Sequence, residues 1–331
     1  MSGGLPTNSS WDFKDSMLAK KPAAIVAYRT PRGAMLHGKS EQALESNYLN
    51  KCKGRVNLIF TSPPYPLNRK KKYGNLKGEE YIDWICSFGE LYKSMLTRDG
   101  SIVMEIGNSW EAGSPTMSTL ATRALLEFLE RNNLYLCQEF VWNNPAKLPS
   151  PVQWVNVERT RVKDSFTKLW WMSPVENPKA NNRNVLVEYS KSMKGLLKRG
   201  SYNSGSRPSE HRIGAKSFLT NHGGAISGSV LTYPNTSSDD KYHSYCRDKG
   251  IRPHPARMPA NLAEFFIKFL TDENDTVMDP FGGSNTTGYV AQSLNRNWIS
   301  IEPNMEYIAS STSRFPDAKL TSNFERKVLF A

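Results

Sequence analysis

The sequence has few cysteines and no long apolar run, and each absence excludes a class of protein. Its 331 residues contain four cysteines, none in a CxxC pair and none clustered with histidine. This spacing argues against a structural zinc site and against a disulfide framework. No apolar run approaches the roughly 20 residues that span a membrane, and the first residues lack the basic-then-apolar pattern of a secretory signal. We therefore expect a cytoplasmic protein.

Acidic residues are outnumbered, which bears on the kind of partner. The chain has 43 Lys and Arg against 31 Asp and Glu, a net charge of +12. Such a balance favours a polyanionic partner. Part of the excess is local, because nine basic residues and only two acidic ones lie between Lys179 and Lys216. By its charge alone this segment is either a solvated basic loop or a surface that faces a nucleic acid, and the motifs described below favour the second interpretation.

Strand-like and helix-like patterns alternate along most of the chain. Strands are predicted at 33–37, 56–60, 101–106, 135–142, 166–172, 276–278 and 298–301. Helices are predicted at 40–49, 79–96, 117–131, 262–270 and 286–294. Alternation of this kind predicts an α/β fold with a mostly parallel, doubly wound sheet.

The alternation stops over one long segment, which predicts an insert. Residues 179–250 are rich in Ser, Asn, Gly, Lys and Arg and poor in apolar runs, and a gap of that length is typical of a functional or disordered region. We expect a catalytic domain in two parts, 1–178 and 251–331, separated by a 179–250 insert.

A glycine-rich turn follows the predicted strand at 276–278 and resembles a nucleotide-type cofactor loop. It reads Asp279-Pro280-Phe281-Gly282-Gly283-Ser284-Asn285-Thr286. Glycines allow the backbone to approach a ligand closely. The next predicted strand ends in Glu302, 23 residues after Asp279, where Rossmann-like sites place the acid that binds ribose hydroxyls. A nicotinamide cofactor is disfavoured because GxGxxG is absent here.

A second motif, Ser62-Pro63-Pro64-Tyr65, follows the predicted strand at 56–60. The Ser62 hydroxyl and the Pro63 carbonyl can accept hydrogen bonds from the two N–H groups of an aromatic amine, and this localises the nitrogen lone pair. The prolines fix the backbone, so the acceptors are preorganised. Tyr65 is expected to stack on the aromatic ring that carries the amine. Glu105, after the apolar run 102–104, is a candidate acid that assists the amine.

Together these motifs resemble the β-group amino DNA methyltransferases, in which the clamp precedes the cofactor loop. The resemblance covers nearly the whole chain after residue 30 and includes Asn144-Pro145-Ala146-Lys147-Leu148-Pro149, which is similar to the N4-cytosine enzymes of restriction-modification systems. Residues 69–76 and 254–259 resemble most of all the member that protects CAGCTG sites. The family commonly has a third glycine where Asn285 stands.

The resemblance implies a circularly permuted Rossmann-like fold and S-adenosylmethionine (AdoMet) as cofactor, without a metal. It implies a monomer in the bacterial cytoplasm that flips a base from double-stranded DNA and shields that DNA from a cognate restriction endonuclease. The implied catalytic residues are Ser62, Pro63, Pro64 and Tyr65. The implied cofactor residues are Asp279, Phe281, Gly282, Gly283, Ser284, Asn285, Thr286, Glu302, His254 and Arg257. Phosphate or base contacts are expected from Arg69, Lys70, Lys71, Lys72, Arg207 and Arg212.

Ser62 favours cytosine N4 as the target, because enzymes acting on adenine N6 mostly carry Asp or Asn at that position. Adenine N6 on the same scaffold remains an alternative, as do an RNA or protein amide methyltransferase and a catalytically dead DNA-binding protein. Cytosine C5 chemistry is disfavoured, since no cysteine follows a proline. Residues 33–40 match the Walker A pattern, but their bulky alternating side chains predict a strand instead of a phosphate loop.

Overall fold

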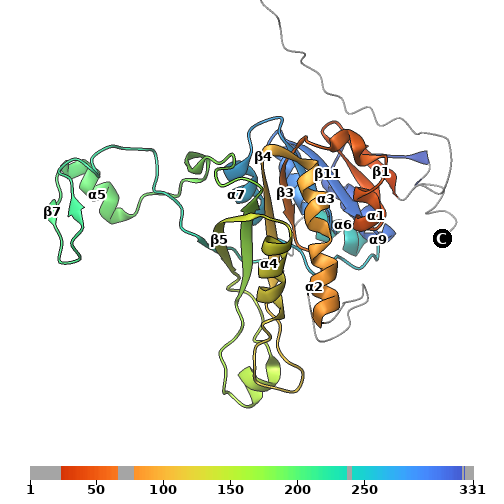
Figure 1. Ribbon diagram of the computed structural model, residues 1–331, viewed down its shortest axis with the longest axis horizontal. Coiled ribbons are helices and arrows are strands. Elements are labelled where there is room, and N and C mark those ends of the chain that lie inside the picture. Colours follow the sequence, from red (N-terminus) through yellow and green to blue (C-terminus); the bar gives the residue numbers. More distant parts are fainter. Residues whose placement is uncertain (1–23, 66–77, 237–240, 323, 325–331) are drawn as a thin grey trace, which may run out of the picture. The chain divides into compact units, whose positions relative to one another are not determined.

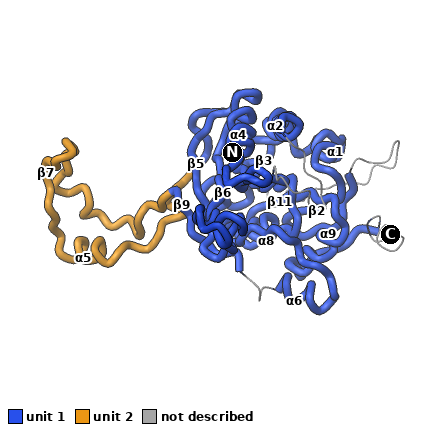
Figure 2. The backbone as a smooth tube through the Cα atoms, turned by 90° about the horizontal axis from the view of Figure 1, so that it is seen from below, with its two compact units in different colours: residues 1–179, 229–331 blue, residues 180–228 orange. Residues whose placement is uncertain are grey.

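The computed structural model describes residues 24–65, 78–236, 241–322 and 324. They divide into two compact units, residues 1–179 with 229–331 and residues 180–228, which Figure 2 colours separately. The second unit is shorter than the 179–250 insert expected from the sequence. Residues 229–250 belong to the first unit, because β9 (Val230–Thr232) joins its sheet and the buried Tyr242 and Cys246 anchor α6 (Lys241–Asp248) to it.

The first unit is built on one ten-stranded sheet in the order β12-β1-β2-β11-β10-β3-β4-β6-β5-β9 (Figure 1). The central strands from β2 to β4 run parallel, and β6 is antiparallel to both of its neighbours. This confirms the predicted α/β class, with a sheet that is mixed: its centre is parallel, and antiparallel pairs lie on either side of that centre. The remaining strands are β1 (Ile25–Thr30), β2 (Gly33–His37), β3 (Val56–Thr61), β4 (Leu96–Gly107), β5 (Tyr135–Asn143), β6 (Phe166–Ser173), β10 (Thr276–Asp279), β11 (Asn297–Glu302) and β12 (Lys319–Leu320).

Helices cover both faces of this sheet. One face packs against α1 (Ser40–Leu44), α2 (Gly78–Cys86), α3 (Phe88–Met95) and α4 (Leu120–Arg131). The other packs against α7 (Ala260–Leu270), α8 (Thr286–Ser293) and α9 (Met305–Ser311). The helix predicted at 79–96 is two helices, and its last residue already belongs to β4. The Walker-like segment forms β2 and the start of α1, as its alternating side chains predict.

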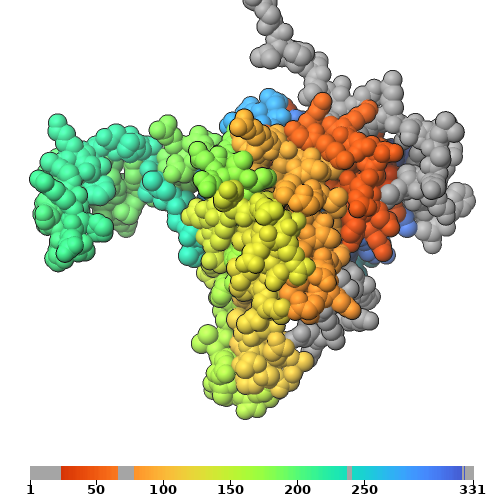
Figure 3. Space-filling view, in the orientation of Figure 1, coloured from red at the N-terminus to blue at the C-terminus, as the bar shows by residue number. Residues whose placement is uncertain are grey.

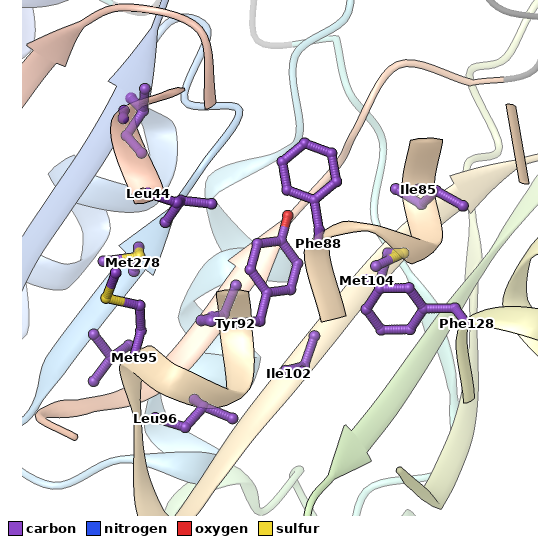
Figure 4. Packing of buried hydrophobic residues seen from close by; sticks show 14 of the residues in the cluster. Leu44, Ile85, Phe88, Tyr92, Met95, Leu96, Ile102, Met104, Phe128 and Met278 are labelled. Carbon is purple, nitrogen blue, oxygen red and sulfur yellow. The ribbon is translucent and has the colours of Figure 1, made fainter. Parts of the chain in front are cut away.

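The side chains of each strand alternate between the two helical layers. Ile59 of β3 faces the layer that includes Leu44, Phe88, Tyr92 and Phe128, several of which Figure 4 shows in contact around Ile102 and Met104. Its neighbour Phe60 faces α7, with its ring centroid 5.4 Å from that of Phe266. Both faces of the sheet are therefore buried, as is usual for parallel strands. The carboxyl ends of the strands are the part of the sheet left open to a ligand.

The second unit has little buried apolar area. It contains α5 (Lys191–Arg199) and a hairpin of β7 (Gly205–Ser206) with β8 (Arg212–Ile213). Ser190 caps α5 through its side chain, and Gly200 ends the helix in the left-handed conformation that glycine adopts without steric cost. Hydrogen bonds to Tyr189 and Tyr202 tie its loops together. No helix in the described ranges is long and apolar enough to cross a membrane.

Candidate active site

The two motifs meet at one edge of the sheet, although more than 200 residues separate them. β3 and β10 are parallel neighbours, so the residues that follow them emerge side by side. The Thr61 hydroxyl donates to Asp279 Oδ1 at 3.0 Å and joins the last residues of the two strands. In open α/β sheets, ligands bind outside the carboxyl ends of the strands, where the strand order reverses. The chain places both motifs at such a point.

Asp279 holds the beginning of the cofactor loop. Besides Thr61, it accepts hydrogen bonds from the Thr287 hydroxyl at 2.7 Å and from the backbone N–H of Phe281 at 3.1 Å. Burial raises the pKa of Asp279 to about 6, against the opposing effect of these donors. The Phe281 ring packs 5.7 Å from Trp84 and 5.4 Å from Phe88. The loop is thus fastened to the sheet and to the α2–α3 layer.

Glu302 closes the loop from the end of the neighbouring strand. Its carboxylate accepts from the backbone N–H of Gly283 at 2.9 Å and from that of Asn304 at 2.8 Å. Burial raises the pKa of Glu302 to about 7. Gly283 has φ +50°, and a Cβ there would lie 3.1 Å from His254 Nε2. The backbone conformation and the close approach of His254 therefore both favour a glycine at this position.

Asn285 is buried within the loop that it shapes. It adopts the left-handed conformation with φ +56°, which Asn tolerates better than most residues. Its Oδ1 accepts from Ser300 Oγ at 2.8 Å and from the Gly288 N–H at 3.2 Å, while its Nδ2 donates to Tyr28 at 2.8 Å. The side chains of Ser284 and Thr286 are also buried. These polar groups stabilise the loop, and its backbone is the part presented to a ligand.

His254 lies beside the cofactor loop, and Arg257 follows it on the segment that leads to α7. The His254 ring packs edge-on against Tyr307, with centroids 4.6 Å apart. The Arg257 guanidinium lies over the Tyr242 ring at 5.5 Å and contacts His243 Nδ1 at 3.3 Å. Both residues line a cavity of about 210 Å³. The structure therefore brings His254 close to the glycine turn.

The clamp is organised around Glu105, which lies near the end of β4. The Ser62 hydroxyl donates to Glu105 Oε2 at 2.5 Å, and the Tyr65 hydroxyl donates to Oε1. Glu105 is 2% exposed. Burial raises its pKa, and the hydrogen bonds from Ser62 and Tyr65 oppose that effect. Because Ser62 donates its only proton to Glu105, the lone pairs of its oxygen remain available as acceptors.

Tyr65 is held in one orientation by its surroundings. Its hydroxyl is fixed by Glu105, and a Cβ added to Gly107 would lie 2.5 Å from Tyr65 Cε2. Gly107 is therefore the residue that makes room for the ring. Sequence reasoning did not find this contact, since nothing in the spacing of the two residues connects them.

Ser62, Tyr65 and Glu105 line a cavity of about 860 Å³ in the first unit. Aromatic and polar side chains that sequence reasoning did not select complete its wall. Lys147 Nζ lies 3.0 Å from Asp164 Oδ2, and Asn108 Nδ2 donates to Asp164 Oδ1 at 2.9 Å. Arg257 also lines the cavity. Other lining residues are Trp110, Trp142, Trp154 and Phe166.

The predicted DNA contacts fall in two places. Residues 69–72 lie outside the described residues. Arg207 and Arg212 flank the turn of the β7–β8 hairpin in the second unit, where Arg207 N donates to His211 O at 2.9 Å and its guanidinium to Asn203 O at 2.7 Å. Arg212 is exposed. Within the described ranges, no three His, Cys, Asp or Glu side chains gather in a way that could hold a metal ion.

Comparison with known proteins also points to DNA methylation. A family model described as DNA methylase matches residues 56–313. The type II methyltransferase M.PvuII of Proteus hauseri is 42% identical over 97% of this chain and 93% of its own length. The solved structure of the PvuII DNA methyltransferase, titled cytosine-N4-specific, has 38% identity and a TM-score of 0.71 over 92% of this chain and 93% of that chain.

More distant relatives agree on the fold. A DNA modification methylase from Thermus thermophilus, solved in complex with S-adenosyl-L-methionine, is 16% identical with a TM-score of 0.51 over 86% of this chain and 92% of that chain. The type II methyltransferase M.BglII of Bacillus subtilis is 27% identical over 76% of this chain and 61% of its own length. With the match over residues 56–313 and 42% identity to M.PvuII, the chain belongs to the DNA methylase family.

Proposed function

We propose that this chain is a site-specific DNA methyltransferase that transfers the methyl group of AdoMet to the exocyclic N4 of cytosine in duplex DNA. The observation that carries the proposal is the clamp, in which the buried Glu105 carboxylate accepts a hydrogen bond from the Ser62 hydroxyl. An amine entering the cavity meets an oxygen that can only accept. Family membership and 42% identity to M.PvuII support the same reaction.

The clamp residues act on the nucleophile. The Ser62 oxygen and the Pro63 carbonyl accept the two N–H groups of the base, which draws the nitrogen toward tetrahedral geometry and localises its lone pair. AdoMet, when bound, supplies an electrophilic methyl group whose bond to sulfur breaks as the bond to N4 forms. The surplus N4 proton passes to Ser62 as Ser62 gives its own proton to Glu105. The raised pKa of Glu105 favours this acceptance.

The first clamp residue decides our choice of base. Ser62 favours cytosine, and the relative titled cytosine-N4-specific shares 38% identity with this chain. The same scaffold acting on adenine N6 is the alternative. It predicts a different methylated nucleoside, so product analysis separates the two.

The loop from Asp279 to Thr287, with Glu302, fits AdoMet as cofactor. Gly282 and Gly283 leave the backbone uncovered, and Glu302 is a buried carboxylate at the strand end next to them. That position suits an acceptor for ribose hydroxyls. Phe281, His254 and Arg257 complete the proposed surroundings. Structures of similar fold that were solved with this cofactor support the assignment.

Target recognition is assigned to the second unit, with 229–250 left to the catalytic part. Its basic side chains, Arg207 and Arg212 among them, are suited to phosphates and guanine edges. Residues 69–72 are proposed as a further phosphate contact. We expect CAGCTG, with its inner cytosine as target, a monomeric enzyme, and a cognate restriction endonuclease in the same bacterial cell.

Mass spectrometry of nucleosides from plasmid DNA incubated with the protein and AdoMet tests the function. We expect N4-methyldeoxycytidine, its loss in Ser62→Ala, and its retention in Ser94→Ala, which removes an exposed hydroxyl from α3. N6-methyldeoxyadenosine would overturn the choice of base. AdoMet binding without either product would overturn DNA methylation itself.

A further inference from the structure

One wall of the catalytic cavity is the inner side of a projecting segment. We call residues 144–165, between β5 and β6, the arm; Figure 3 shows it projecting from the first unit. Its base is fixed by the Lys147–Asp164 ion pair at 3.0 Å and by the hydrogen bond from Asn108 to Asp164. Its outer part is tied to the neighbouring loop by Arg161 Nε, which donates to Pro115 O at 3.0 Å. The arm is thus built as a defined structure.

The arm carries four apolar side chains that are largely exposed. Leu148 is 80% exposed, Val152 60%, Val157 63% and Val162 86%. Among these four, Val152 lines the cavity that holds Ser62, Tyr65 and Glu105. Because Val152 lines this cavity and is also largely exposed, it can contact whatever enters the cavity.

The charge of the arm indicates a polyanion. It carries four basic and two acidic residues. Both acids are engaged, Asp164 with Lys147 and Glu158 with the Gln153 amide at 3.0 Å. Arg159, Arg161 and Lys163 form no ion pair with any residue that the structure describes. The arm that carries Val152 therefore has a net positive charge.

We propose that the arm enters the duplex at the target position and that Val152 fills the space vacated by the flipped base. This inference rests on the proposed function, in which the target base leaves the helix. Flipping exposes the faces of the neighbouring bases, and apolar side chains inserted between base steps cover such faces. Arg159 would then contact a flanking phosphate. Arg161 and Lys163 donate to backbone carbonyls of the first unit and add positive charge to the same segment. Val152 is a positioning residue in this proposal, because it acts on the duplex and not on the reacting atoms.

The fluorescence of 2-aminopurine at the target position tests the inference, because this base becomes bright when it is unstacked. The probe is a duplex carrying the site that the wild-type protein methylates, with 2-aminopurine in place of the target base. Val152→Ala should lower the flipping equilibrium constant roughly tenfold, as expected for two methyl groups removed from a buried contact. Val152→Ile should retain it. Val157→Ala is the matched control, with the same substitution at a side chain of similar exposure.

A second duplex distinguishes a Val152 side chain that fills the vacated space from one that only supports the structure of the arm. When the target cytosine stands opposite an abasic site, pairing no longer holds it in the helix, and the defect of Val152→Ala in kcat/KM should shrink to less than about twofold. An equal defect on both duplexes, or equal flipping by Val152→Ala and Val157→Ala, would overturn the proposal. So would a change in sedimentation without a change in flipping, since the arm would then contact a second copy. Absence of any methylated base with the wild type would instead refute the proposed function.

Discussion

The cofactor loop and the clamp both rest on buried carboxylates, but the partners of these carboxylates differ. Asp279 and Glu302 accept hydrogen bonds from backbone N–H groups and from hydroxyls that pack within the sheet and loop. Glu105 accepts from Ser62 and Tyr65, the two side chains that would meet the base. The first pair of acids stabilises a conformation of the backbone, whereas Glu105 controls the protons of reactive side chains.

This difference predicts which changes affect folding and which affect the reaction. A substitution at the cofactor loop removes hydrogen bonds that the fold depends on, so stability should fall. A substitution at Glu105 leaves the strands intact and changes the hydrogen bonding of Ser62 and Tyr65, so methyl transfer should fall.

Glu105→Ala gives the largest expected effect. Without the carboxylate, Ser62 and Tyr65 lose the acceptor that orients them, and the surplus proton of the amine has no destination. We expect kcat to fall roughly 100- to 1000-fold, the size typical of a lost general base, with AdoMet affinity unchanged. Single-turnover methylation and calorimetric AdoMet binding measure the two quantities.

Glu105→Gln and an exposed acid control this experiment. The glutamine keeps one oxygen for the hydroxyl donors but cannot take a proton as the carboxylate does, so its kcat should lie between the wild type and Glu105→Ala. Glu158→Gln changes an exposed arm residue in the same way and should leave kcat near the wild-type value. Equal loss of AdoMet binding in both Glu105 variants would mean that Glu105 supports the whole site and not the clamp.

The pH dependence of stability should report the loop carboxylates. Burial raises the pKa of Glu302 to about 7 and that of Asp279 to about 6, so the folded protein retains protons that the unfolded chain loses. The two groups contribute fully to the free energy of unfolding when the pH is below their pKa values in the unfolded chain, which are near 4. This contribution is lost as the pH rises toward 7. For Glu302 the loss should be about 3 kcal/mol.

Urea unfolding of the cofactor-free protein between pH 4.5 and pH 8 measures this effect. Glu302→Gln should flatten the decline, because the amide does not titrate. Glu273→Gln, at an exposed acid outside the loop, is the control and should leave the decline unchanged. A decline of the same size in Glu302→Gln would assign it to other groups.

Asn285→Ala should destabilise the loop by about 2–4 kcal/mol, since it leaves Tyr28, Gly288 N and Ser300 without their partner. Asn295 has φ +62° but is exposed, so Asn295→Ala should cost only about 1 kcal/mol. Asn285→Gly should cost less than Asn285→Ala, because glycine removes the strain but not the lost hydrogen bonds. Thermal unfolding measures all three. Equal losses of stability in Asn285→Ala and Asn295→Ala would mean that Asn285 contributes only its left-handed backbone conformation and not its side-chain hydrogen bonds.

The sequence located the clamp and the cofactor loop because each is a short local motif after a buried strand. It also placed Glu105 near the end of its strand, but its contact with Tyr65 joins segments 40 residues apart, and no periodicity reports such a contact. The packing of residues 229–250 with the first unit was not predicted, for a related reason. Residues 229–250 look polar, yet β9 joins the sheet through backbone pairing, and two buried side chains suffice to anchor α6.

The smallest expected effect is on DNA binding by the second unit. There the charge of an exposed side chain, and not its burial, should determine what a substitution changes. Arg212 is exposed in β8, so Arg212→Ala should leave the unfolding temperature unchanged. If Arg212 contacts a phosphate, the slope of log binding constant against log salt should flatten by about 1. Arg98→Ala is the control, since Arg98 is an exposed arginine on β4 in the first unit. A fluorescence anisotropy titration over a range of salt concentrations distinguishes them, and equal slopes for both variants would remove Arg212 from the DNA surface.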